Sequence, residues 1–314
     1  MHNSFKFNIG ALIAGIPQKL IVIFGKVIGT IAFNIDIRHR RIVRRNLSFV
    51  YSDWSNAKIN SHSLEVFQNF GIFVMELCQL FFLPKEKILK KVNIRGEKEI
   101  KALMESDKGA VLISAHLGNW ELMSFFIPCY FNKPVIAVAK KIRPAILNRF
   151  IVRLRTRFGN EMIDKKKGLS KMSAVLSRKE KLGILIDQST SRAEGVEVKF
   201  FNHTVTATPA AALLAMRHRC KVVLLYCVRE GKGYTFIAEP VDLVRTNNLR
   251  ADLKANTQIM TYAIEKAVKK YSQQWFWFHK KWKRHHPELY SEDIAKRQKR
   301  RRKKRSTNVF TKNV

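Results

Sequence analysis

The stretch AVLISAHLGNWE, residues 110–121, passes from an apolar run through a short link into a second apolar segment. Residues 110–115 have the length and composition of a short buried strand. Gly118 permits a tight turn after that strand, and an apolar helix is expected from Glu121 onward. A buried strand that turns sharply into a helix is typical of a sheet covered by helices.

The rest of the chain repeats this alternation of strands and helices. Further strands are expected at residues 134–139, 183–187, 196–201, 221–228 and 234–238, and helices at 61–83, 97–106, 144–158, 169–177 and 249–271. The Gly-Lys-Gly turn at 231–233 implies at least one antiparallel pair. The pattern therefore predicts an α/β fold with a mixed β-sheet flanked by helices.

His116 follows the strand at 110–115, and the carboxyl ends of strands are where reactive groups collect in open α/β sheets. Glu121 can fold back to the imidazole if the link between them is tight. A carboxylate on one ring nitrogen fixes the tautomer and raises the basicity of the other nitrogen. The pair therefore predicts a general base for a hydroxyl substrate. The alternative is a core histidine beside a glutamate that serves the helix dipole.

The N-terminal region is apolar from residue 7 to residue 35, with interruptions. Its cleanest part, residues 20–35, is about 16 residues long, short of the roughly 20 that a spanning helix needs. No cleavage site of the signal-peptide kind follows. We expect a retained anchor that either spans the membrane, with Lys26 snorkelling, or lies in the interface. A buried helix of the main domain is the alternative.

Positive charge dominates the chain, with 59 Lys and Arg against 24 Asp and Glu and a net charge of +35. Such an excess indicates a polyanionic partner, and nucleic acid, an anionic bilayer or an acidic protein would each fit. The basic cluster at 38–45 marks the cytoplasmic side of a membrane anchor. The run KRQKRRRKKR at 296–305 predicts a disordered tail.

Three regions follow from these patterns: an anchor with its basic flank (1–45), a catalytic domain (46–290) and a polybasic tail (291–314). No zinc-finger, bZIP or RNP signature supports a nucleic-acid-binding protein, which stays a remote alternative. No H-E-x-x-H or similar ligand cluster is present, so neither a metal nor a cofactor is expected.

Residues 114–121 closely resemble the H-x-x-x-x-D/E motif of the glycerolipid acyltransferase superfamily, and their GNWE form is similar to the late (secondary), or Kdo-dependent, lipid A acyltransferases. Further blocks resemble that family at residues 46–47, 154–159, 187–188, 200–208 and 275–282. The resemblance runs from roughly residue 10 to residue 285. It departs at Lys280-Lys281, where arginine is common, and lysine lacks the bidentate fork of a phosphate clamp.

The resemblance implies transfer of a fatty acyl chain from acyl carrier protein to a hydroxyl of a lipid A precursor, in lipopolysaccharide or lipooligosaccharide biosynthesis. His116 would be the general base and Glu121 would orient it. The remaining candidate groups, for the oxyanion or for substrate, are Gly118 with its backbone N–H groups, Asn119, Arg155, Asp187 and Gln188. For the function of the protein, a glycerophospholipid acyltransferase is the nearest alternative. For Asp187 alone, the alternative is a structural role as a turn or helix cap.

The implied partners match the charge, because acyl carrier protein is acidic and the lipid acceptor carries phosphates and acidic sugars. The expected location is the cytoplasmic face of a bacterial inner membrane, with anionic lipid as a further partner and no nucleic acid. The aromatic and basic run at 275–282 suits a site at headgroup level. The alternative for that run is a helix end packed on the core with its lysines in solvent.

Overall fold

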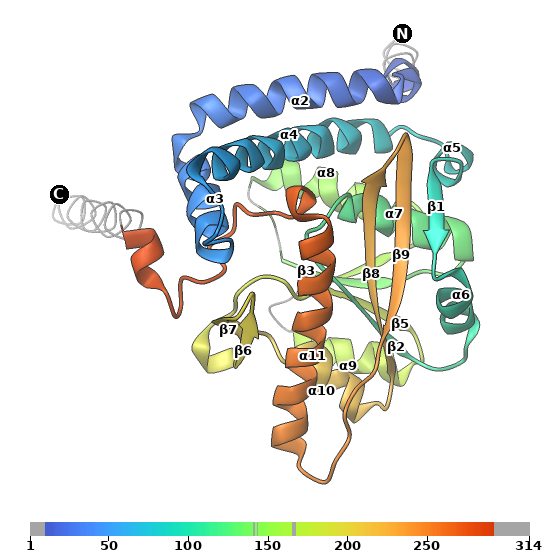
Figure 1. Cartoon of the computed structure of the whole chain (residues 1–314). Coiled ribbons are helices and arrows are strands. Elements are labelled where there is room, and N and C mark those ends of the chain that lie inside the picture. The colour runs from blue at the N-terminus through green and yellow to red at the C-terminus, as the bar shows by residue number, and fades with distance from the viewer. Residues whose placement is uncertain (1–9, 141, 143, 165–167, 292–314) are drawn as a thin grey trace, which may run out of the picture.

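The computed structural model describes residues 10–140, 142, 144–164 and 168–291, so the run at 296–305 lies outside the described residues (Figure 1). Its centre is a seven-stranded sheet in the order β1-β9-β8-β2-β5-β3-β4, with a separate hairpin of β6 and β7. The strands are β1 (Val92–Arg95), β2 (Ala110–Ser114), β3 (Ile136–Ala139), β4 (Glu161–Asp164), β5 (Lys181–Leu185), β6 (Val196–Phe200), β7 (His203–Ala207), β8 (Lys221–Glu230) and β9 (Gly233–Val241).

Within the large sheet every pairing is parallel except that of β8 with β9, which form the hairpin predicted from the Gly-Lys-Gly turn. The predicted mixed sheet flanked by helices is confirmed. Three strands were not predicted, namely β1, β4 and β7. β1 and β4 are the two edges of the sheet, have four residues each and bury few side chains, so they carry little apolar signal.

Helices cover both faces of the sheet (Figure 1). They are α2 (Gln18–Ile35), α3 (Ile37–Val50), α4 (Asn56–Leu80), α5 (Lys85–Leu89), α6 (Glu97–Glu105), α7 (Trp120–Phe131), α8 (Ala145–Thr156), α9 (Gly168–Ser177), α10 (Ala210–Arg217) and α11 (Leu249–Lys270). The chain has two hydrophobic cores, one on each face of the sheet, and strand β2 contributes side chains to both. Val111 and Ile113 pack with α9, α10 and α11, whereas Ala110 and Leu112 pack with α6 and α7. Each large buried side chain contributes about 1.5–3 kcal/mol.

The N-terminal helix α2 packs along α4 at the end of the sheet where β2 terminates (Figure 1). Among the described residues, α2 is the one helix whose length and composition would allow it to cross a membrane. Its first residue, Gln18, donates through Nε2 to Glu76 of α4 at 3.4 Å. Glu76 is buried and forms an ion pair with Arg229 of β8 at 2.9 Å. Helix α2 is thus fixed to α4, and α4 to the sheet.

Candidate active site

His116 and Asp187 meet beyond the carboxyl ends of two neighbouring strands. β2 and β5 are parallel, with Ser114 in register with Leu185, and each partner lies two residues past its strand. His116 Nδ1 is 2.8 Å from Asp187 Oδ1, and the His116 backbone N–H donates to Asp187 Oδ2 at 2.9 Å. The sheet register therefore places this carboxylate against the imidazole.

The pair sets the protonation of the imidazole. The buried Asp187 has its pKa held well below the usual range, because the charge and hydrogen bonds of His116 outweigh the opposing effect of burial. An ionised carboxylate only accepts, so Nδ1 carries the proton and Nε2 keeps a free lone pair in neutral imidazole. Burial alone would lower the pKa of His116, but the charge and hydrogen bond of Asp187 raise it above 6.5. The side chain is 22% exposed, so Nε2 is the atom available as a base.

Two groups from the C-terminal part of the chain hold Asp187. The indole Nε1 of Trp275 donates to Asp187 Oδ2 at 3.0 Å. The Lys281 ammonium donates to the Asp187 backbone carbonyl at 2.5 Å and lies 5.0 Å from the centre of the Phe200 ring. Burial lowers the pKa of Lys281 to about 8. Trp275 therefore fixes the carboxylate, and Lys281 fixes the backbone of the same residue.

Of the two expectations for residues 275–282, only the packing on the core agrees with the structure. Trp275, Trp277 and Trp282 are 3%, 0% and 0% exposed, and Lys281 is 1% exposed. These four side chains therefore do not lie at headgroup level, and the Lys281 ammonium is not in solvent. Hydrophobic burial of three indoles outweighs the cost of burying one ammonium, which finds a carbonyl partner. Trp275 and Lys281 therefore support the site from within the core.

Glu121 occupies a different position from the one expected. It lies in the first turn of α7, where its carboxylate receives Arg155 Nε at 2.8 Å and Nη2 at 2.5 Å, and Trp120 Nε1 at 3.1 Å. The expected orienting contact of Glu121 with the imidazole is not formed, because Asp187 holds Nδ1 and Arg155 holds the Glu121 carboxylate. The charge of Glu121 still contributes to the raised pKa of His116. A functional role for Glu121 stays a prediction.

Asn119 is fully buried and both polar atoms of its side chain are in use. Oδ1 caps α7 by accepting the backbone N–H of Leu122 at 2.8 Å, and Nδ2 donates to Glu76 at 2.8 Å. The predicted substrate contact of Asn119 is thus replaced by a structural role.

The backbone N–H groups of the turn at Gly118 are also occupied. The φ of Gly118 is +63°, and a Cβ at this position would lie 2.1 Å from the carbonyl oxygen of Cys227. The backbone N–H of Gly118 donates to Gln274 at 3.0 Å and that of Asn119 donates to Cys227 at 2.7 Å. These N–H groups cannot serve as the oxyanion donors proposed from the sequence.

Arg155 is the remaining candidate for that role. It projects from α8, its side chain is 19% exposed, and Glu121 holds two of its three nitrogens. Among the described residues, its Nη1 atom has no hydrogen-bonding partner. Gln188 is exposed beside Asp187, and its contact with substrate stays a prediction.

Aromatic rings line the surroundings of His116. Trp120 and Phe276 lie 5.2 and 6.0 Å from the imidazole centre, and Phe73 of α4 stacks on Trp120 at 4.0 Å. A narrow cleft runs past them, lined by Val66, Asn69, Phe70, Phe73, Gly118, Trp120, Arg229, Gln273, Gln274, Trp275, Phe276 and Phe278. The lining combines these aromatic rings with the polar side chains of Asn69, Arg229, Gln273 and Gln274.

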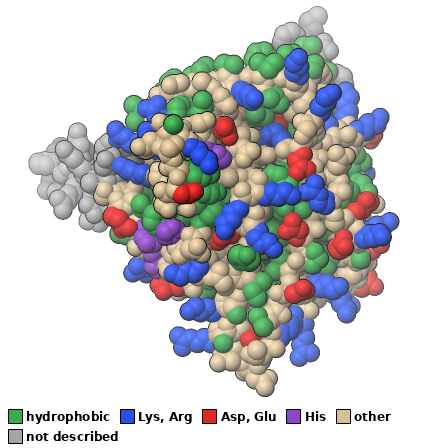
Figure 2. Space-filling model, viewed as in Figure 1, with side chains coloured by type: hydrophobic (Ala, Val, Ile, Leu, Met, Phe, Trp, Pro, Cys, Tyr) green, Lys and Arg blue, Asp and Glu red, His purple; other side chains and the backbone are tan. Residues whose placement is uncertain are grey.

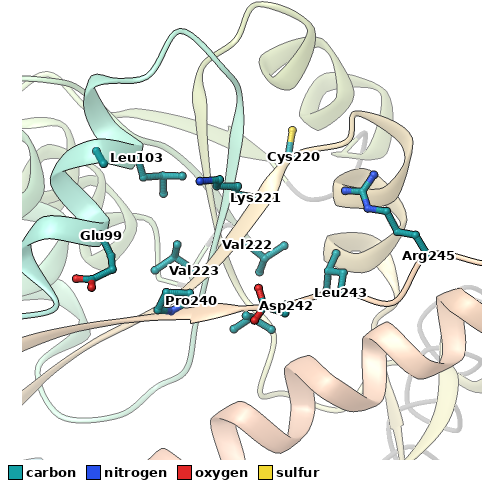
Figure 3. A pocket seen from close by; sticks show the side chains of 12 residues that line it. Glu99, Leu103, Cys220, Lys221, Val222, Val223, Pro240, Asp242, Leu243 and Arg245 are labelled. Atoms are coloured by element: carbon teal, nitrogen blue, oxygen red, sulfur yellow. The ribbon is translucent and has the colours of Figure 1, made fainter.

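A larger cavity of about 350 Å³ lies at the other end of the sheet, where β8 begins (Figure 3). Its polar lining mixes Glu99 and Asp242 with Lys221 and Arg245. None of the site residues predicted from the sequence lies there, so the chemistry is assigned to the opposite end.

The family follows from comparison with known proteins. The family model described as bacterial lipid A biosynthesis acyltransferase matches residues 3–284. The chain belongs to this family. The resemblance identified from residues 114–121 and the other blocks is thereby confirmed, and the His116 site lies inside the matched region.

Individual relatives are distant. The chain is 23% identical over 275 residues to the lipid A biosynthesis lauroyltransferase of Escherichia coli, covering 87% of this chain and 88% of that protein. It is 22% identical over 220 residues to the phosphatidylinositol mannoside acyltransferase of Mycobacterium tuberculosis, covering 68% of each. Both relatives are acyltransferases, and they differ in the lipid that their names give.

Proposed function

We propose that this member of the lipid A acyltransferase family transfers a fatty acyl chain from acyl carrier protein to a hydroxyl of a lipid A precursor. The observation that carries the proposal is the His116–Asp187 pair at adjoining strand ends. It leaves a basic Nε2 on an imidazole that lies beside the rings of Trp120 and Phe276. The role would lie in lipopolysaccharide or lipooligosaccharide biosynthesis.

In the proposed reaction His116 Nε2 takes the proton of the acceptor hydroxyl as its oxygen attacks the thioester carbonyl. Asp187 stabilises the imidazolium that forms. The tetrahedral oxyanion is stabilised by Arg155, whose guanidinium Glu121 orients through two hydrogen bonds. Collapse breaks the carbon–sulfur bond, and the leaving thiolate receives the proton from the imidazolium. In this proposal Glu121 acts by orienting Arg155, and it makes no contact with the imidazole of His116.

The charge of the chain supports the same partners. A net charge of +35 favours encounter with an acidic carrier protein and with phosphorylated lipids. The apolar helix α2 supports attachment to the inner membrane, with the catalytic residues on its cytoplasmic face. The electrostatic part of this association should weaken as salt is raised, because dissolved ions screen the charges.

The test is an acyl-transfer assay with purified full-length protein, an acyl carrier protein thioester and a lipid A precursor, read by mass spectrometry of the lipid. The wild type should add one acyl chain, and His116→Ala should lose activity while keeping its melting temperature. Full turnover by His116→Ala would refute the proposed base.

Parallel reactions with a lysophospholipid and with a mannosylated phosphatidylinositol examine the acceptor, since one relative is named for the latter. Transfer to either lipid, with none to the lipid A precursor, would replace the proposed acceptor and leave the chemistry at His116 in place.

A further inference from the structure

Helix α2 has one face that nothing in the described structure covers. Its exposed large apolar residues form a stripe: Leu20, Ile23, Phe24, Val27, Ile28, Ile31 and Ile35. Their spacing keeps them on one side of a helix with 3.6 residues per turn. Figure 2 shows hydrophobic side chains along the upper edge of the molecule, where α2 lies in Figure 1. A continuous patch of this kind marks an interaction surface.

The opposite face of α2 is locked onto α4. Gly25 and Gly29 are buried there against Gly71, and a Cβ at Gly71 would lie 2.2 Å from the Gly25 carbonyl oxygen. Gln68 donates to the Thr30 hydroxyl at 3.0 Å. The two backbones therefore touch along a surface of small residues, and α2 runs beside α4 over its whole length (Figure 1).

A spanning orientation of α2 conflicts with this packing. Its 18 residues reach about 27 Å, less than the roughly 30 Å of a hydrocarbon core. Lys26 is at the middle of the helix and would lie at the bilayer centre, where a lysine weakens insertion by roughly 100-fold. Crossing would also draw α4 into the lipid, and α4 carries Glu76, which is paired with Arg229 of the sheet.

The positions of the lysines fit a flat orientation instead. Lys19 and Lys26 are seven residues apart, so they lie on the same side of α2, at one margin of the apolar stripe, and both are exposed. A helix with an apolar face and flanking lysines lies in the plane of the interface, with the lysines toward anionic phosphates.

We propose that α2 lies flat in the lipid–water interface of an anionic bilayer, with the Leu20–Ile35 stripe about 5–10 Å into the headgroup and acyl boundary. This inference rests on the membrane attachment given under the proposed function. Because Phe73 of α4 stacks on Trp120 beside His116, the flat helix holds the reacting end of the sheet close to the membrane surface.

The depth of three labelled positions tests the orientation. Leu20→Cys, Val27→Cys and Ile35→Cys, each made in full-length Cys78→Ser protein, carry an environment-sensitive dye; the other three cysteines are buried. Vesicles of phosphatidylcholine and phosphatidylglycerol contain lipids with quenchers at known depths. A flat helix gives one shallow depth for all three labels.

A label at position 27 near the bilayer centre, with labels 20 and 35 near opposite surfaces, would overturn the flat orientation alone. Absence of vesicle binding would overturn the attachment as well. The acyl-transfer assay on the same samples separates both results from failure of the proposed chemistry.

A charge-substitution pair tests the stripe itself. Phe24→Glu combined with Val27→Glu should weaken partition into the same vesicles by roughly 100-fold, because two inserted apolar side chains are lost. The matched control is Leu249→Glu at the start of α11, which is 64% exposed and distant from α2. Equal partition of the double variant and the control, with unchanged circular dichroism, would overturn the proposal.

Discussion

Replacing Asp187 by asparagine keeps the size of the side chain and removes its charge. In the wild type Oδ2 accepts two hydrogen bonds, from the His116 backbone and from Trp275, whereas Oδ1 accepts only the imidazole. The single amide oxygen of asparagine should take the Oδ2 position, since it satisfies two donors there. The amide NH₂ then faces His116 Nδ1 and donates to it, which moves the ring proton to Nε2. The base would be lost through the wrong tautomer.

The size of the effect follows from that geometry. Losing a hydrogen bond to a charged group costs about 1.5–3 kcal/mol, or roughly 10- to 150-fold in rate. A wrong tautomer costs more, and the same substitution in the Ser-His-Asp template lowers kcat by roughly 10⁴-fold. We therefore expect Asp187→Asn to lower kcat by about 10³- to 10⁴-fold with a small change in KM.

The pH dependence gives a second readout. Only neutral His116 accepts a proton, so activity should rise with pH through the His116 pKa, which lies above 6.5 in the wild type. Without the Asp187 charge the desolvation of the ring dominates and this pKa falls. The rising limb of any residual activity should move to lower pH.

Initial rates from pH 5.5 to pH 9 measure both quantities, and ¹⁵N spectra of labelled histidine report the tautomer. The control is Asp242→Asn, an exposed acid just after β9, which should behave as wild type. Asp187→Asn with more than a tenth of wild-type kcat and an unmoved rising limb would refute the role given to Asp187.

Four further substitutions follow from the same contacts. Lys281→Met should lower the free energy of unfolding by about 1–3 kcal/mol, because the Asp187 carbonyl loses its donor, and urea denaturation measures it; an unchanged midpoint would contradict this. Arg155→Lys should lower kcat by roughly 10²- to 10³-fold, and Glu121→Gln by less. The rising limb should stay near the wild-type pH for Arg155→Lys and move slightly to lower pH for Glu121→Gln, because the Glu121 charge contributes to the raised pKa of His116; a shift as large as that of Asp187→Asn would restore a direct contact of Glu121 with His116. Gly118→Ala should cost about 1–3 kcal/mol of stability, since it combines positive φ with a contact at 2.1 Å, and a melting temperature equal to wild type would contradict that.

The sequence predicted the architecture well because its central strands are apolar and sharply bounded. It failed where tertiary contacts decide. Glu121 pairs with Arg155, 34 positions away, because the start of α7 points its first turn toward α8. The composition of residues 275–282 does not tell whether the run is buried or lies at a membrane surface, since indoles and lysines occur in both environments. Asp187 was detectable, because its offset from β5 equals that of His116 from β2.

The buried carboxylate of Glu76 has a practical consequence for preparing a soluble enzyme. It accepts from Gln18 at the start of α2 and from Asn119, the cap of the helix that carries Glu121. Removing the N-terminal part of the chain up to the end of α2 would remove one of these donors. It would also expose the surface of α4 around Gly71, which α2 covers. A water-soluble form is better obtained by changing the outward residues of α2 to polar ones, which leaves that helix in place as an internal support of the catalytic loop.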